Sequence, residues 1–178
     1  LLTGFNPAPD LTVRSVAVAG NTVYAGGDFE NIGGQPRRFV AALNAATGVA
    51  SAWNANVSST VNAILPAGGT IYLGGQFTKI GSETRNRIGA VNSTNATVLA
   101  WHPNANSVVN TLAVAGNSAY VGGQFNVIGA QKRSRLAAFD VRTGQVTPWD
   151  PAANDTVRAL AVTGDLVYAG GEFGIIGG

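Results

Sequence analysis

The chain has no cysteine, no methionine and a single histidine in its 178 residues. The lack of cysteine excludes disulfides, thiolate metal sites and a cysteine nucleophile. His102 alone supports neither a Ser-His-Asp triad nor a histidine-based metal cluster. It stands where Asn6, Asn54 and Asp150 stand in the other copies of a repeat described below, so the position requires a polar turn residue rather than an imidazole.

Charge is scarce as well. Charged residues make up 11% of the chain, against roughly 25% in soluble domains. The acidic residues are scattered, and neither a calcium-binding D-x-D-x-D loop nor a G-x-x-x-x-G-K-[ST] phosphate loop is present. No apolar run reaches the roughly 18 residues of a membrane helix. We therefore expect no enzyme, no catalytic residues, no cofactor, no metal and no membrane span.

A nucleic-acid partner is not expected either. The formal net charge is only +2, and no aromatic residues alternate with the basic ones to form a stacking surface. Glycine, by contrast, is abundant at 24 residues, and hydrophobic residues reach 46%. This composition favours an all-β protein with many tight turns.

The sequence repeats itself every 48 residues. The segment Tyr24–Gly33 recurs at 72–81, 120–129 and 168–177, and Trp53, Trp101 and Trp149 keep the same spacing. We interpret residues 1–178 as a single repeat domain, with full repeats at 5–53, 53–101 and 101–149 and a partial repeat at 149–178.

Each repeat contains four short apolar runs separated by turn residues. In the second copy they are 61–65, 70–73, 87–91 and 97–101, and no segment shows a helical apolar period. Four short strands in 40 to 50 residues are typical of one propeller blade. The sequence thus predicts an all-β fold, a β-propeller of four-stranded antiparallel blades, present as about three and a half blades.

The repeated aromatic residues are expected to fill the space between blades, and the Gly-Gly step to turn the backbone sharply so that Phe reaches the core. Leu1–Phe5 aligns with the end of a fourth strand. An open propeller leaves apolar faces and sheet edges exposed. We therefore expect the natural protein to continue beyond one or both ends, with further blades of the same chain or another copy needed for closure.

Several motifs in common register resemble a known family. They are Tyr120–Gly129, Arg133, Arg135, Ala138, Asp140, Thr143-Gly144 and Trp149-Asp150-Pro151. This pattern is similar to the delta-sixty repeat, a β-propeller repeat of bacterial secreted and surface proteins. The resemblance implies an extracellular or cell-surface location and supplies no catalytic residues.

A weaker similarity is to the blades of quinoprotein and kelch-type propellers. Asn44, Thr47-Gly48 and Trp53 resemble the tryptophan-docking motif of quinoprotein dehydrogenases, but four residues separate Gly48 from Trp53 where that motif has three. Blade packing explains the shared residues, because Asn caps a turn, Gly supplies the bend and Trp fills the gap.

Most basic residues fall in or just after the connection between the second and third runs of a repeat. They are Arg37, Arg38, Arg85, Arg87, Lys132, Arg133 and Arg135. One interpretation is a face that binds an anionic ligand such as an acidic polysaccharide, because guanidinium groups make bidentate contacts to carboxylates. The other is that each arginine ties its own blade together.

Candidate N-glycosylation sites, relevant only if the host glycosylates secreted proteins, are Asn56, Asn92, Asn95 and Asn154. The leading functional hypothesis is a non-enzymatic extracellular or cell-surface scaffold for adhesion, matrix or assembly, with a polysaccharide or another surface protein as partner. The first alternative is a lectin-like propeller that uses the loops after the second and fourth runs. The second is a propeller enzyme such as a quinoprotein dehydrogenase.

Overall fold

The computed structural model describes residues 4–177 and confirms an all-β protein, with no helix among those residues. The aligned positions 1–3 lie outside the described residues. The first unit comprises β1 (Val13–Ala19), β2 (Thr22–Gly27), β3 (Asn31–Ile32), β4 (Gln35–Pro36) and β5 (Val40–Asn44). The second comprises β6 (Val61–Ala67), β7 (Thr70–Gly75), β8 (Lys79–Ile80), β9 (Glu83–Thr84) and β10 (Ile88–Asn92).

The third unit repeats this order with β11 (Val109–Ala115), β12 (Ser118–Gly123), β13 (Val127–Ile128), β14 (Gln131–Lys132) and β15 (Leu136–Asp140). The fourth contains β16 (Val157–Thr163) and β17 (Leu166–Gly171). Every pairing is antiparallel. The main sheets have the orders β1-β2-β5, β6-β7-β10 and β11-β12-β15, and β16-β17 forms a hairpin.

The fourth run of each repeat differs from the expectation of four-stranded blades. It makes only isolated bridges, Leu43↔Ala50, Val91↔Val98 and Phe139↔Val146. In the first unit the amide of Ser51 still donates to the Ala42 carbonyl, and the chain then leaves the sheet. Beyond this point Trp53 lies against the second unit, where its indole Nε1 donates to the Asn92 carbonyl at 3.0 Å.

The tryptophans pack between units, as expected. Trp53 lies edge-on to Tyr24 with ring centroids 5.4 Å apart, and Trp101 and Tyr72 repeat this geometry at 5.0 Å. Edge-to-face contacts at such distances are favourable beyond the burial they provide. The core residue that follows the double glycine, Phe77 in the second unit, is fully buried.

The double glycine of each unit does not make the sharp turn that we expected. It allows close packing of the backbone instead. Neither Gly74 nor Gly75 has a positive φ. A Cβ on Gly75 would lie 2.1 Å from the Thr60 carbonyl oxygen, and a Cβ on Gly74 would lie 2.5 Å from Cγ1 of Val109. Glycine is therefore needed because the backbone and the next unit approach too closely for a side chain, not because of its φ range.

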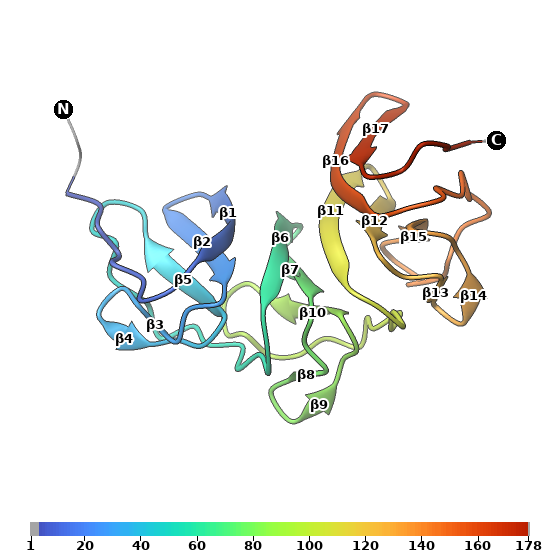
Figure 1. Cartoon of the computed structure of the whole chain (residues 1–178). Helices are drawn as coiled ribbons and strands as arrows, with labels where there is room; N and C mark the ends of the chain where they lie inside the picture. The colour runs from blue at the N-terminus through green and yellow to red at the C-terminus, as the bar shows by residue number, and fades with distance from the viewer. Residues whose placement is uncertain (1–3, 178) are drawn as a thin grey trace.

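The units follow one another along an arc (Figure 1). The first strand of each unit contacts the first strand of the next, β1 with β6, β6 with β11 and β11 with β16. The first and the last described residues lie on opposite sides of the molecule, and the arc of described residues remains open (Figure 1). Both end units consequently have one face without a neighbour.

Candidate functional site

Three of the predicted anion-binding arginines hold their own units together. Arg37, Arg85 and Arg133 each donate from Nη1 to the carbonyl of the preceding residue at 2.8 Å. Each also donates from Nη2 to the carbonyl fourteen residues on, at 2.6 to 3.0 Å. These bonds tie the connection after the second strand to the fourth run. Arg85 is only 8% exposed, so its charge is directed into the protein.

Arg87 and Arg135 donate hydrogen bonds to a second group of backbone carbonyls. Arg87 donates from Nη1 to the carbonyls of Gln76 and Phe77, and Arg135 does the same to Gln124 and Phe125. Both arginines adopt a positive φ, 65° and 67°, as does Phe39 at the matching place in the first unit. A left-handed backbone costs a bulky residue about 1–3 kcal/mol, which the two carbonyl bonds help to offset.

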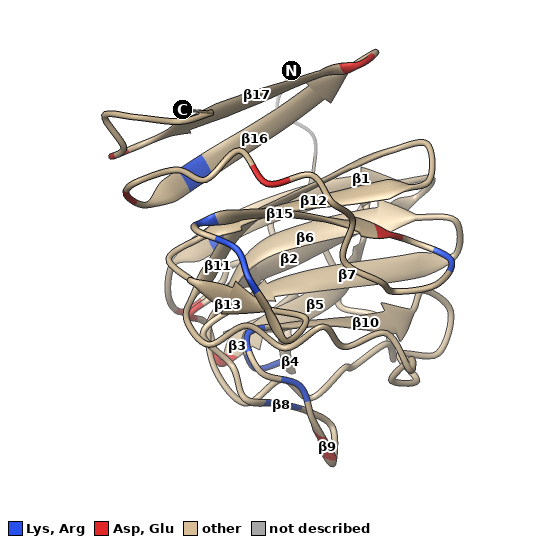
Figure 2. Cartoon of the chain, turned by 90° about the vertical axis from the view of Figure 1, so that its right-hand side faces the viewer, with Lys and Arg blue, Asp and Glu red and all other residues tan. Residues whose placement is uncertain are grey.

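Arg38 and Lys132 are the exposed members of the predicted set. The Arg38 guanidinium lies 3.7 Å from Glu30, with both side chains more than half exposed. Lys132 lies exposed on β14. Figure 2 shows basic segments mainly near β4, β8, β9 and β13, with acidic residues at several loops and strand ends. The anion-binding face stays a prediction, and the structure gives most of its guanidinium groups a structural role.

The loop before each first strand also carries a repeated polar residue. Asp10, Ser58, Asn106 and Asn154 occupy this place. In every unit its side-chain oxygen accepts two successive backbone N–H groups twenty and twenty-one residues on, at 2.9 to 3.1 Å. These bonds join the loop before the first strand to the connection after the second strand. The 48-residue spacing of the four polar residues is the sequence feature from which this contact could have been inferred.

Three acidic side chains are held ionised by their partners. Hydrogen bonds from the Arg14 side chain hold the pKa of Asp28 below its ordinary value. Hydrogen bonds from Asn31, first from its side chain, lower the pKa of Asp10. The pKa of Asp140 is lowered mainly by the Thr143 amide, which donates to its carboxylate. All three act as acceptors in turns and strand ends, not as proton donors.

One position of the repeat alternates between an acid and an amide: Asp28 and Glu172 stand where the second and third units have Gln76 and Gln124. A second position changes with it. Asp28 pairs with Arg14 at 2.7 Å, and Glu172 pairs with Arg158. In the second and third units the residues matching the arginines are Asn62 and Asn110, whose amides donate to the Val109 and Val157 carbonyls at 3.3 and 3.0 Å. A charged pair in the end units is thus replaced by amides that bond to the next unit.

The candidate glycosylation sites lie in connecting segments, except Asn92, which ends a strand. Asn56, Asn95 and Asn154 are exposed, and Asn92 is half-buried at the end of β10. Asn92 and Asn95 accept turn amides through their Oδ1 atoms at 2.8 to 3.2 Å. Their use as glycosylation sites stays a prediction.

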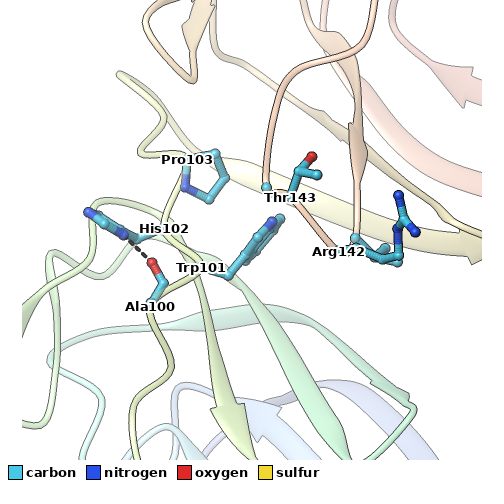
Figure 3. A pocket seen from close by; sticks show the side chains of 8 residues that line it. Ala100, Trp101, His102, Pro103, Arg142 and Thr143 are labelled. Carbon is cyan, nitrogen blue, oxygen red and sulfur yellow. Dashed lines mark hydrogen bonds between the residues drawn. The ribbon is translucent and has the colours of Figure 1, made fainter.

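A pocket of about 340 Å³ lies where the second unit meets the third, lined by residues 100–103 and 141–144. Figure 3 shows the Trp101 ring lying close to Thr143 and Arg142, with His102 beside the Ala100 carbonyl to which it is hydrogen-bonded. Trp101 packs edge-on to Phe139 at 5.9 Å. Within residues 4–177, its Nε1 is buried without a hydrogen-bond partner.

Neither a metal-holding cluster nor a membrane-spanning helix is present in the part of the chain that the structure describes. Over residues 4–177 no group of three or more His, Cys, Asp or Glu side chains gathers to hold a metal ion. None of the described segments forms a helix long and apolar enough to cross a bilayer.

No family model and no curated protein matches the sequence. Among solved structures, the chain is similar to the computationally designed Ika4 protein, with 16% identity and a TM-score of 0.63, covering 95% of this chain and 91% of that one. The computationally designed Ika8 protein also matches, at 16% identity and a TM-score of 0.52, covering 92% of this chain but 57% of that one. At this identity the likeness concerns the fold alone. The resemblance to the delta-sixty repeat stays a prediction.

Proposed function

We propose that this chain is a non-enzymatic scaffold, a segment of a β-propeller related to the delta-sixty repeat on an extracellular or cell-surface protein. The observation that supports it is the use of the repeated polar side chains. Arg85, Asp28 and Asn106, with their equivalents, bond to backbone groups or to partner side chains within the protein. Side chains that make these internal bonds stabilise the fold. The loop residues that differ between units are then available to contact partners in adhesion or assembly.

A binding screen tests this proposal. The chain is exposed to acidic and neutral polysaccharides at low and high salt, and the melting temperature and saturable binding are measured. A scaffold shows no saturable binding and no rise in melting temperature. Binding to acidic polysaccharide that weakens with salt, and that is lost in the Arg38→Gln/Lys132→Gln variant but kept in Lys79→Gln, would establish the anion-binding face instead. Lys79 is an exposed control outside that set.

The pocket beside Trp101 favours a second candidate, a lectin-like module. Its lining brings the Trp101 ring together with Thr143 and Arg142 of the segment 141–144 (Figure 3), and aromatic rings with nearby polar groups are common in ligand sites. The matched variants are Thr143→Ala and Thr47→Ala, because each hydroxyl accepts the amide two residues on at 3.3 Å. Saccharide binding lost only in Thr143→Ala would assign the pocket. Equal binding by both variants would place the sugar elsewhere.

A further inference from the structure

The junctions inside the chain share one packing device, a valine seated on a glycine. A Cβ placed on Gly26, Gly74 or Gly122 would lie 2.5 to 2.7 Å from Cγ1 of a valine in the next unit. Those valines, which begin β6, β11 and β16, are Val61, Val109 and Val157, and all three are fully buried. The glycine therefore forms a hole and the valine fills it, three times with the same atoms.

Further contacts accompany this device. The Thr60 hydroxyl donates to the Asp28 carboxylate across the first junction at 2.8 Å. Beside the valine, Ile64 of the second unit lies over Gly26, where its Cδ1 would be 2.8 Å from a Cβ. Tyr24 of the first unit meets Trp53, the residue that leads into the second. Each junction thus joins a buried valine and a tryptophan to the glycine hole and the tyrosine of the previous unit. The threonine-to-carboxylate bond accompanies them at the first junction, whereas Val108 stands at the threonine position of the second.

Both halves of a fourth such junction are present and unpartnered at the two ends of the arc. Gly170 matches Gly26, and no described atom lies within 4 Å of a Cβ placed there. Tyr168 matches Tyr24 but is 55% exposed. At the other end Val13 matches Val61, and Val16 matches Ile64 but is 60% exposed where Ile64 is 7% exposed.

We infer that the β1 face of a second copy of this chain packs head-to-tail on the β16-β17 face of the first. Val13 of one copy occupies the hole at Gly170 of the other, and Val16 covers it as Ile64 covers Gly26. Glu172 stands where Asp28 stands and accepts from the Thr12 hydroxyl, which matches Thr60. Phe5, which matches Trp53, lies against Tyr168. The inference rests on the repeat architecture of the proposed scaffold and requires no ligand.

A second copy is the occupant because the two faces are complementary to each other. The repeat keeps its 48-residue spacing from the first unit to the fourth. The β1 face therefore carries Val13 and Val16 at the repeat positions that fill the hole inside the chain. The β16-β17 face carries Gly170 at the repeat position that forms the hole. A heterologous contact of this kind either closes into a ring or grows into a chain of copies, depending on the rotation between copies.

Sedimentation equilibrium over a wide concentration range tests the association. The unsubstituted 178-residue chain is expected to form species of two or more copies, and Gly170→Val is expected to weaken association at least tenfold. Gly174→Val is the matched control, since a Cβ at Gly174 also meets open space and Glu30, Thr78 and Asn126 occupy that position in the other units. A natural chain that stays monomeric throughout, or a Gly174→Val variant that weakens as much as Gly170→Val, would overturn the inference.

Cysteine cross-linking tests the geometry, because the chain has no native cysteine. A Cβ at Gly74 lies 3.3 Å from the Val109 Cβ, close to the roughly 3.5–4.5 Å of disulfides. Mixing Val13→Cys with Gly170→Cys is expected to give a disulfide-linked pair that neither variant gives alone at comparable yield. The Gly74→Cys/Val109→Cys variant, which links within one chain, verifies the oxidation conditions. No linked pair in the mixture, or equal yield from either variant alone, would overturn the head-to-tail geometry while leaving the ligand screen for the scaffold untouched.

Discussion

The second and fourth units contain the same motif in two different surroundings. Tyr72 and Tyr168 follow the same kind of first strand, yet Tyr72 is 8% exposed and Tyr168 is 55% exposed. Gly74 lies against Val109, and Gly170 lies in open space. The motif therefore does not bury its tyrosine and glycine by itself; a neighbouring unit has to cover them.

The difference shows where the stability of such a chain comes from. A unit of three short strands cannot bury its apolar face alone, and neighbouring units supply the missing surface. Repeat arrays of this type are stabilised by nearest-neighbour terms in addition to the stability of each unit. An inner unit has two such terms, and each end unit has one.

The largest effect is expected from truncating the buried phenylalanine. Phe77→Ala should lower the free energy of unfolding by about 3–5 kcal/mol, because Phe77 is fully buried between strands and hairpin. Phe173→Ala, at the matching place in the fourth unit, should cost roughly 1 kcal/mol, since that ring is only half-buried. Urea denaturation measures both. Equal losses would show that the fourth unit is as well supported as the second.

A valine at the glycine hole is the next test. Gly74→Val should lower the free energy of unfolding by about 1–3 kcal/mol through overpacking against Val109. Gly170→Val meets open space and should change it by less than about 0.5 kcal/mol. Thermal unfolding at low concentration, where copies do not associate, compares the two. Similar losses would contradict the assignment of Gly74 to the junction.

The period of 48 residues and the strand-forming runs could be predicted from the sequence, because Tyr72, Trp101 and the glycines recur with fixed spacing. The hairpin β8-β9 could not, because strands of two residues carry no measurable alternation of apolar residues. The weak fourth strand could not either. Its apolar run fits a strand, and only the folded arrangement shows that Trp101 leaves the sheet.

In the candidate site, too, some features could be predicted from the sequence and others are seen only in the folded structure. That Arg85 and Arg133 matter could be read from their repetition, but their role depends on which carbonyls the folded backbone brings within reach. Both interpretations of these arginines were compatible with the sequence, because spacing does not distinguish a strut from a ligand contact. The pocket beside Trp101 was not predicted at all, since it joins residues about forty positions apart.

A difference of comparable size is expected between buried and exposed arginines. Arg85→Gln should lower the free energy of unfolding by about 1–3 kcal/mol, because the Thr84 and Leu99 carbonyls lose a charged donor. Arg38→Gln should stay within about 0.5 kcal/mol, since that side chain is exposed. Melting temperatures of the two variants measure this. A stable Arg85→Gln protein would favour a ligand-binding role for the repeated arginines.

The smallest effect concerns pH. The pKa of Asp28 is lower in the folded state than its ordinary value because Arg14 donates to the carboxylate. The stabilisation is therefore present at neutral pH and is lost as the pH falls through the folded-state pKa. An exposed pair of this kind contributes about 0–1 kcal/mol. Denaturation of Asp28→Asn and the natural protein should differ at pH 7 and converge in acid; a constant difference would contradict this assignment.

Native-state hydrogen exchange, measured in the Gly170→Val chain to exclude association through the fourth unit, tests most directly whether neighbouring units supply the stability. The account predicts that amides of β7 and β12 exchange only in near-global unfolding, and that amides of β16 and β17 exchange through local opening of much lower free energy. Equal protection in all four units would contradict it, because a fourth unit with one neighbour would then be as stable as an inner unit with two.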